Sequence, residues 1–423
     1  MAGPIPTRLL PDTAAISADG RLRIGGCDLV DLAGEYGTPL FVYDEAHLRA
    51  RCREAVTAFG DGVAYASKAF LCDAMARLAH EEGMHLDVAT GGELFVALRA
   101  GVPADRLVMH GNNKSDAELA MALDEGVGRI VVDSFDELDR LDALAGSTGS
   151  RPRVLLRITP GVEAHTHEFV ATGQDDSKFG FTVSSGLATA AVERAIGSAS
   201  VELVGLHAHI GSQVFEVGAF ARAVEVLADF AAPFGLAELS VGGGLGVPYV
   251  EGESAPSITE WASGIRAVCE AAGVMASVSA EPGRAIVAAA AITLYTVGTI
   301  KDLPGIRTYV AVDGGMSDNP RPVLYGSGYE TFLPRAAAAE RARSVRVVGK
   351  HCESGDLLVR EGWVPNDLAV GDVLATPVTG AYGHAMGSNY NHVLRPAVVF
   401  VADGDARMVV RRETFEDLVR REV

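Results

Sequence analysis

The chain has 423 residues, 48% hydrophobic and 22% charged, a balance typical of a globular enzyme with a large core. Its net charge of −19 argues against binding to nucleic acids or to anionic membrane surfaces, because both require basic patches. No apolar run approaches the roughly 20 residues of a membrane span, and Met1–Leu10 lacks the apolar segment of a signal peptide. Five scattered cysteines without a C-x-x-C pair indicate reduced thiols, so we expect a cytoplasmic protein.

Between about residues 60 and 290, short apolar or β-branched runs alternate with amphipathic stretches rich in Ala, Leu and Glu. The runs are Val63–Ser67, His85–Ala89, Leu107–Met109, Ile130–Asp133, Val154–Ile158, Val204–Ile210, Leu236–Val241 and Ala276–Ala280. One helical stretch opens with Ser115-Asp-Ala-Glu118, which fits a capping box. Eight strands that alternate with helices predict a (β/α)8 barrel of the TIM type, an α/β fold, in preference to an open doubly wound sheet.

The pattern changes after about Ala290 to short runs separated by Gly, Pro and Asp turns. These runs are Ile292–Ile300, Thr308–Val312, Ser344–Val348 and Val398–Val401. They predict a second, mostly β domain, which a short N-terminal strand at Leu22–Ile24 would join. We therefore expect an N-terminal segment over residues 1–40 that pairs with the β domain, a barrel over residues 41–290 and the β domain itself over residues 291–423.

Polar or glycine-rich motifs follow six of the eight predicted barrel strands. They are Lys68, Thr90–Gly92, His110–Lys114, His209–Ser212, Gly242–Gly244 and Glu281–Arg284. Ordinary turn residues would explain any one of these motifs, but not six in register. Because the loops at the carboxyl ends of barrel strands converge on one face, we expect the active site there.

Two of these motifs suggest specific chemistry. The glycine run and Gly283, with the hydroxyl of Ser212, offer unobstructed groups of the kind that bind phosphate, although tight strand-to-helix packing is the alternative. Lys68 ends an apolar strand and is one of only five lysines. Desolvation there would favour a neutral, nucleophilic amine, and the alternative is a lysine that snorkels at the barrel rim.

The motifs together resemble those of a known family. Tyr65–Ala69, His209–Gln213, Gly242–Gly244 and Glu281–Arg284 resemble the alanine-racemase-like, fold-type III decarboxylases that use pyridoxal 5'-phosphate. Further motifs are similar to those of the diaminopimelate decarboxylase family: His110–Ser115, Thr159–His167, Lys178–Phe181, Arg321–Tyr325, Cys352–Asp356 and Ser388–Asn391. The resemblance implies decarboxylation of meso-2,6-diaminopimelate to L-lysine and CO₂, the last step of lysine biosynthesis.

The resemblance also implies a role for each cofactor-binding residue. Lys68 would hold the cofactor covalently and His209 would stack on its pyridine ring. Glu281 would keep the pyridine nitrogen protonated, so that the ring can accept electrons, whereas an alanine racemase would place an arginine there. The other cofactor-binding residues would be Ser212, Gly242, Gly243, Gly244, Gly283, Arg284 and Tyr382.

For the substrate, the resemblance implies an active site shared across a homodimer. Cys352 would be the general acid that protonates the α-carbon, although a lone cysteine is more often a small core residue. Cys352, Glu353 and Asp356 would serve the active site of the second copy, where Glu353 would hold the distal ammonium group. The remaining substrate-binding residues would be Arg284, Arg321, Tyr325 and Tyr382, and arginine suits a carboxylate because of its planar fork.

Three positions depart from the family pattern. Ser240 stands where the family often has an aspartate, Gly349-Lys350-His351 lacks the proline that is common before the cysteine, and Gly383-His384 is not the usual bulkier pair. The last two leave room for an altered substrate preference. The alternatives are a decarboxylase for another basic amino acid or a carboxylated polyamine, or a non-catalytic homologue that binds the cofactor. His165 and His167 lie near Glu163, but no third ligand pattern accompanies them and we expect no metal.

Overall fold

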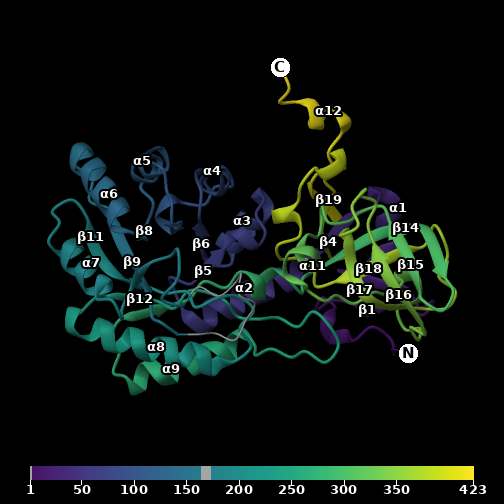
Figure 1. Cartoon of the computed structure of the whole chain (residues 1–423), viewed down its shortest axis with the longest axis horizontal. Helices are drawn as coiled ribbons and strands as arrows, with labels where there is room; N and C mark the ends of the chain where they lie inside the picture. Colours follow the sequence, from purple (N-terminus) through teal and green to yellow (C-terminus); the bar gives the residue numbers. More distant parts are fainter. Residues whose placement is uncertain (1, 163–172) are drawn as a thin grey trace. The chain divides into compact units, whose positions relative to one another are not determined.

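The computed structural model describes residues 2–162 and 173–423 (Figure 1). The chain divides into two compact units. The barrel unit comprises Arg51–Gly246 and Ala255–Ala285, and the β unit comprises Met1–Ala50, Val247–Ser254 and Ile286–Val423. Each unit is described by itself below.

The barrel unit is built on eight parallel strands. In order around the sheet they are β5 (Ala64–Ala66), β6 (His85–Val88), β7 (Leu107–Met109), β8 (Arg129–Val132), β9 (Arg153–Thr159), β11 (Glu202–His207), β12 (Glu238–Ser240) and β13 (Ser277–Ser279). Two hydrogen bonds join the ends of the sheet: the Ala64 amide donates to the Ala280 carbonyl over 3.0 Å, and the Ala66 amide to the Pro282 carbonyl over 3.2 Å. Each of the eight predicted runs overlaps one strand, so the predicted barrel is confirmed.

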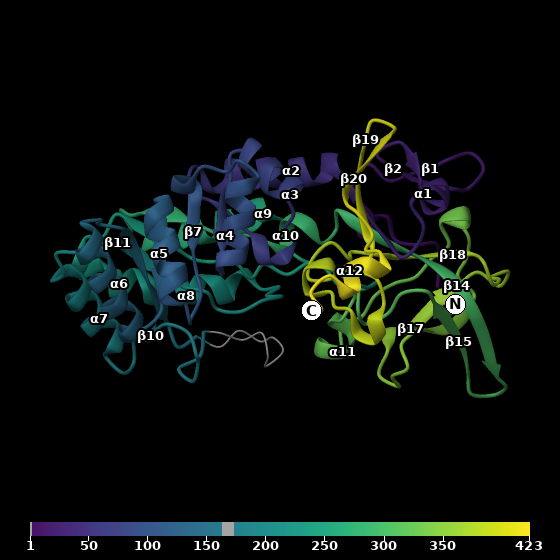
Figure 2. The same ribbon diagram turned by 90° about the horizontal axis from the view of Figure 1, so that it is seen from above.

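Helices follow the barrel strands and lie on opposite sides of them (Figures 1 and 2). They are α2 (Glu45–Phe59), which begins in the β unit, α3 (Asp73–Glu81), α4 (Gly91–Arg99), α5 (Asp116–Glu125), α6 (Phe135–Thr148), α7 (Leu187–Ile196), α8 (Val217–Ala231), α9 (Ile258–Ala271) and α10 (Arg284–Val287). The predicted capping box is present at α5, where Ser115 and Glu118 each accept from the other's backbone amide. Such a cap stabilises a helix by about 1 kcal/mol and fixes where α5 begins. A short strand, β10 (Phe181–Thr182), pairs with β9.

The β unit contains a large sheet and a small one. The large sheet comprises, in order, β17 (Leu357–Val364), β16 (Arg343–Val348), β15 (Arg307–Val312), β14 (Ala291–Leu303), β4 (Leu40–Asp44), β19 (Ala397–Ala402) and β20 (Asp405–Val410), with β18 (Val373–Pro377) also paired to β14. The small sheet comprises β1 (Ala15–Ile16), β2 (Leu22–Ile24) and β3 (Cys27–Asp28). The three helices of this unit are α1 (Leu29–Tyr36), α11 (Arg321–Tyr325) and α12 (Phe415–Val419).

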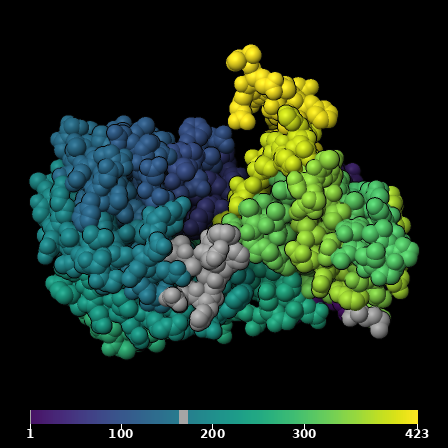
Figure 3. Space-filling model, viewed as in Figure 1, coloured from purple at the N-terminus to yellow at the C-terminus, as the bar shows by residue number. Residues whose placement is uncertain are grey.

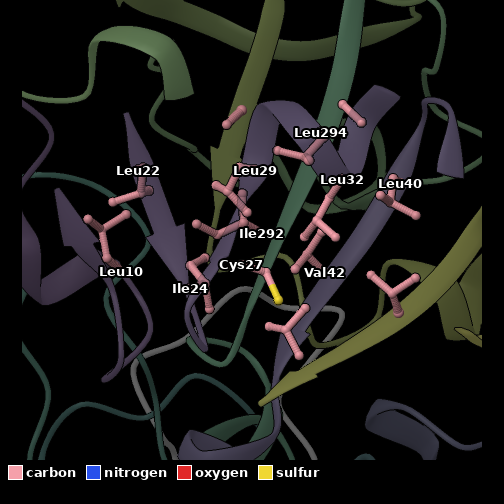
Figure 4. Packing of buried hydrophobic residues seen from close by; sticks show 14 of the residues in the cluster. Leu10, Leu22, Ile24, Cys27, Leu29, Leu32, Leu40, Val42, Ile292 and Leu294 are labelled. Atoms are coloured by element: carbon pink, nitrogen blue, oxygen red, sulfur yellow. The ribbon is translucent and has the colours of Figure 1, made fainter. Parts of the chain in front are cut away.

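The N-terminal segment joins the β unit differently from the expected pairing. The strand expected at Leu22–Ile24 forms, but it pairs with β1 and β3 and not with the large sheet. It is β4 that enters the large sheet, antiparallel to β14 and parallel to β19. The small sheet instead packs on the large one through a shared hydrophobic cluster, which contains Leu22 and Ile24 of the small sheet and Ile292 and Leu294 of the large one (Figure 4). Each buried side chain of this size contributes about 1.5–3 kcal/mol.

The end of the chain leaves the body of the β unit. The C-terminal residues, yellow in Figure 3, project from the surface of this unit, and Phe415 in α12 is largely exposed. Over residues 2–162 and 173–423, no helix is both long enough and apolar enough to cross a membrane.

Candidate active site

A buried carboxylate, Glu281, lies just after β13 and is contacted by side chains from the next two strands of the sheet, β12 and β11. The His207 Nε2 atom, at the end of β11, lies 2.9 Å from Glu281 Oε2, and the Ser240 hydroxyl, at the end of β12, donates to Oε1 over 2.8 Å. Burial by itself would raise the pKa of Glu281, but the two imidazoles of His207 and His110 and these hydrogen bonds lower it well below its ordinary value. Glu281 is therefore ionised at neutral pH.

A second pair of titratable groups lies beside Glu281. The His110 Nε2 atom is 3.6 Å from Glu281 Oε1 and 3.5 Å from Asp87 Oδ1, and the His110 ring meets the His207 ring edge-on at 5.0 Å. Burial lowers the pKa of His110 to about 4. Burial and the charge of Glu281 raise the pKa of Asp87 well above its ordinary value. The two carboxyl groups thus differ in the direction of their pKa shifts, which is downward for Glu281 and upward for Asp87.

Asp87 and His207 are absent from the residues singled out by motif. Both are buried polar residues at the carboxyl ends of barrel strands, in β6 and β11, and this position is the signal that could have found them. The nitrogen atoms of His110 and His207 and a Glu281 oxygen lie within 4.8 Å of one another, a spacing that suits a cation, although His207 Nε2 is already bonded to Glu281.

Close packing of the backbone explains why residues 242–244 are glycines, in addition to the phosphate binding expected from the sequence. A Cβ atom added to Gly242, Gly243 or Gly244 would lie 2.2 Å from the carbonyl oxygen of Ala208, Glu281 or Gly211, respectively. The Gly242 amide donates to Ser240 Oγ over 3.3 Å, and the Gly243 amide donates to His209 Nδ1 over 3.2 Å. The first two glycines therefore build the turn and orient the histidine ring.

His209 lies against this turn, close to several positive charges. Because the Gly243 amide donates to Nδ1, the proton of the neutral ring lies on Nε2. Burial, with the charges of Lys68 and Arg157, lowers the pKa of His209 well below its ordinary value. The ring is therefore neutral and offers a flat apolar face.

A buried arginine that follows β13 is paired with a serine hydroxyl that follows β11. Arg284 is 8% exposed, and its Nη2 atom donates to Ser212 Oγ over 2.8 Å. A Cβ atom added to Gly283 would lie 2.9 Å from Ala66, so only glycine allows this approach to the end of β5. The structure thus brings together Ser212, Gly283 and Arg284, all predicted from the sequence to hold phosphate.

Lys68 lies in a single turn of 3₁₀ helix, Ser67–Ala69, which follows β5. Its side chain is exposed, although Ser67 and Ala69 are buried. The expectation that the apolar strand end desolvates this lysine is wrong for the single chain, because Lys68 is exposed although the residues on either side of it are buried. Its charge nevertheless acts on Asp87 and His209, which places it at the same end of the barrel as the titratable cluster.

In the β unit, a buried arginine is held between two tyrosines. Arg321, which opens α11, is 4% exposed. Its Nη1 atom donates to the Tyr329 hydroxyl over 2.6 Å, and the guanidinium lies 4.1 Å from the centre of the Tyr249 ring. Burial opposes the charge, but Tyr249 and Tyr329 raise the pKa of Arg321, so the guanidinium stays positive. No acidic side chain forms an ion pair with Arg321 in the part of the chain that the structure describes.

Neither Tyr249 nor Tyr329 was expected from the sequence. Tyr329 follows the Arg321–Tyr325 motif by only four residues, but Tyr249 lies far away in the chain, in the loop Val247–Ser254 that belongs to the β unit. Tyr325 and Tyr382 are half-buried, and Tyr382 has a left-handed backbone with φ 59°. Tyr382 also acts to raise the pKa of Arg321, which places it near the guanidinium.

Cys352 and Glu353 lie at the exposed tip of the loop between β16 and β17. Asp356 was expected to face the second copy with them, and this expectation is wrong. Its carboxylate is 3% exposed and accepts hydrogen bonds from within the loop and from Met316. Asp356 therefore shapes the loop and does not extend from it. His165, His167 and Glu163 lie outside the described residues.

The comparisons with known proteins agree with this chemistry. The pyridoxal-binding domain of the pyridoxal-dependent decarboxylases matches residues 45–288. Diaminopimelate decarboxylase of Mycobacterium tuberculosis (strain ATCC 25618 / H37Rv) is 50% identical over 96% of this chain and 95% of its own length. The crystal structure of diaminopimelate decarboxylase from M. jannaschii has a TM-score of 0.91 at 32% identity, with 97% of this chain and 98% of that chain covered. Its complex with L-lysine gives a TM-score of 0.90 at the same identity and coverage.

Proposed function

Because this chain belongs to the diaminopimelate decarboxylase family of pyridoxal-phosphate-dependent enzymes, we propose that it converts meso-2,6-diaminopimelate to L-lysine and CO₂. The carbon that loses its carboxylate as CO₂ gains one proton in its place. When bound, pyridoxal phosphate supplies the ring that accepts the electron pair left behind by CO₂.

The residues of the barrel unit fit this cofactor. Glu281 is ionised, buried and already oriented by His207 and Ser240, so it can hold a proton on a pyridine nitrogen. His209 is neutral and presents a flat ring for stacking. Arg284 and Ser212 are paired where a phosphate group can accept from both. Gly244 and Gly283 each pack so closely on neighbouring backbone that a side chain would not fit, and their amides can take part in holding the phosphate.

Lys68 is the lysine that we assign to the cofactor. Lys114, a buried lysine of the barrel unit, already has partners that occupy its ammonium group. Its Nζ atom lies 2.7 Å from Glu137 Oε1 and donates to the carbonyl oxygens of Gly111 and Val131. Lys68 is exposed and forms no salt bridge with any of the described residues, so it can reach an aldehyde without breaking one.

The observation that carries the substrate assignment is Arg321. A charged guanidinium that is 4% exposed and has two tyrosines but no carboxylate beside it, over the described residues, lacks the partner that buried arginines usually have. A substrate with a second carboxylate supplies that partner, with Tyr325 and Tyr382 as further hydrogen-bonding groups. Lysine and ornithine lack this carboxylate and would leave the charge unpaired.

We assign proton delivery at the α-carbon to Cys352 and recognition of the distal ammonium group to Glu353. Both side chains are exposed at one loop tip, which suits residues that act in the active site of a second copy. The working unit is accordingly a homodimer. All five cysteines are free thiols, which supports a reducing, cytoplasmic location.

The test is product analysis with the purified holoenzyme and a panel of diamino acids. CO₂ release and L-lysine formation should be rapid with meso-diaminopimelate and poor with L-lysine and L-ornithine. Equal turnover of ornithine or lysine would refute the substrate and leave a decarboxylase of basic amino acids. Absence of CO₂ release from every substrate would support the non-catalytic homologue instead.

A further inference from the structure

The loop that carries Cys352 is anchored on both sides of the cysteine. The anchors are side chains to which the proposed mechanism assigns no role. Behind the exposed tip, His351 and Asp356 are buried, with side chains that are 0% and 2% exposed. The anchoring residues all belong to the β unit, so the arrangement is complete within that unit.

Asp356 is the first anchor. Its Oδ1 atom accepts from the Met316 amide over 2.7 Å, and its Oδ2 atom accepts from both the His351 amide and His351 Nδ1, each over 2.8 Å. A Cβ atom added to Gly349 would lie 2.2 Å from Asp356 Oδ2, so the backbone passes as close as a glycine permits. A carboxylate with three donors in a buried site holds its loop strongly.

The His351 ring is the second element. It stacks on the Tyr390 ring with centroids 5.6 Å apart and planes 9° apart, and its buried Nε2 atom has no hydrogen-bond partner within residues 2–162 and 173–423. The bond from Nδ1 to Asp356 and the contact with Tyr390 together fix the orientation of the imidazole.

Asn391 is the third element, and it holds Cys352 itself. The Cys352 amide donates to Asn391 Oδ1 over 3.0 Å. Asn391 has a left-handed backbone with φ 53°, which asparagine tolerates better than most residues. These contacts explain two residues of the Ser388–Asn391 motif: Tyr390 stacks on His351, and Asn391 binds the amide of Cys352.

We propose that His351, Asp356 and Asn391 are positioning residues that fix the backbone of Cys352, so that its thiol is presented at one place for proton delivery. This inference rests on the proposed role of Cys352 as the proton donor. A general acid must lie within hydrogen-bond reach of the atom that it protonates, and a displacement of about 1 Å costs about 100-fold in rate. The three residues act through Cys352 and do not touch the substrate.

The first test measures the anchoring directly, by hydrogen exchange of the amides around Cys352 in the holoenzyme. Asn391→Gly removes the acceptor without backbone strain, and we expect about fivefold faster exchange at the Cys352 amide, the equivalent of one lost hydrogen bond. Asn391→Asp keeps an acceptor oxygen and should restore slow exchange. Asn389→Ala is the matched control, because Asn389 bonds to Val393 and Glu413 and not to the cysteine loop.

The second test measures the chemical consequence. His351→Phe keeps a ring to stack on Tyr390 but loses the bond from Nδ1 to Asp356. For this variant and for Asn391→Gly, we expect kcat to fall by about 10-fold to 100-fold with KM little changed. We also expect the solvent deuterium isotope effect on kcat to rise, because proton delivery becomes slower. A purely structural defect would lower the active fraction and leave that isotope effect unchanged.

The two proposals fail differently. If Cys352→Ala retains full activity, the proposed role of the cysteine is wrong, whatever the exchange data show. If Cys352→Ala is inactive but His351→Phe and Asn391→Gly match the wild type in kcat and isotope effect, the positioning proposal is overturned and the proposed function stands.

Discussion

The Nη1 atom of Arg321 lies 2.6 Å from the hydroxyl oxygen of Tyr329, in a site from which water is almost excluded. The hydrogen bond is charge-assisted, and together with the Tyr249 ring it leaves the guanidinium little freedom to rotate. An arginine held in this way can recognise a carboxylate at small entropic cost.

Arg321 should therefore decide the substrate. Removing one partner of a buried charged pair costs about 2–5 kcal/mol, so Arg321→Ala should lower kcat/KM for meso-diaminopimelate by about 30-fold to several thousand-fold. The Arg321→Ala variant should have nearly the same low kcat/KM with lysine as with meso-diaminopimelate. The measurement is kcat/KM for both substrates with both proteins. Unchanged discrimination in the variant would contradict the assignment.

Tyr329→Phe should produce a smaller loss of the same kind. A hydrogen bond to a charged group contributes about 1.5–3 kcal/mol, which corresponds to roughly a 10-fold to 150-fold lower kcat/KM if the guanidinium is released. Tyr309→Phe is a matched control, because Tyr309 also lies beside an arginine, Arg307, elsewhere in the β unit. Equal effects of the two substitutions would argue against a specific role for Tyr329.

Lys68 should carry the cofactor. Reduction of the wild-type enzyme with borohydride should fix the cofactor on the peptide that contains Lys68, and Lys68→Ala should lose both the adduct and the activity. Peptide mapping by mass spectrometry checks this. A cofactor fixed on Lys114, Lys178, Lys301 or Lys350 would show that the site is assigned wrongly.

Mixed dimers should restore activity from two inactive variants. If Cys352 serves the active site of the second copy, a heterodimer of Lys68→Ala and Cys352→Ala keeps one site with both native residues. Random reassortment of equal amounts gives heterodimers for half of the molecules, so up to about a quarter of the native activity should return. No recovery after confirmed subunit exchange would place both residues of each site on one chain.

Asp318 should make stability depend on pH. Burial raises the pKa of this carboxyl to about 7 in the folded chain, while the Tyr295 hydroxyl and the Gly315 amide donate to it. Its pKa is higher folded than unfolded, so the group lowers the stability as pH rises from about 4 to about 7, by at most about 1.4 kcal/mol per pH unit. Asp318→Asn should remove this loss. The Tm difference between variant and wild type should therefore increase from pH 5 to pH 8, and a constant difference would contradict the shift.

Lys114 and Glu137 should behave as a buried pair. Their side chains are 0% and 2% exposed, so either Lys114→Met or Glu137→Leu alone should destabilise the barrel unit by about 3–5 kcal/mol, since each leaves an unpaired group. The double variant should be less destabilised than the sum of the two. Denaturant unfolding of all four proteins measures this coupling, and strict additivity would contradict it.

The sequence alone determined the barrel, because its signal is local. Each run such as Leu107–Met109 is short, apolar and followed by a helix start such as the Ser115–Glu118 box, and eight repeats leave little choice of fold. The same regularity placed Glu281, Arg284 and Ser212 near one another, since residues at the carboxyl ends of parallel strands share one face. Motifs with fixed order and spacing also identified Arg321 and Cys352 as candidates.

Only the tertiary structure decided what surrounds these residues. Tyr249 reaches Arg321 from a loop more than 70 positions earlier in the chain, and β4 enters the large sheet while β2 does not. The opposite pKa shifts of Asp87 and Glu281 depend on burial and on the neighbouring charged groups, which no local pattern contains. Likewise, Lys68 is exposed and Asp356 is buried, because backbone turns a residue or two away set the direction of each side chain. Local sequence fixes periodicity and capping, whereas pair contacts, desolvation and side-chain direction arise only once distant segments pack together.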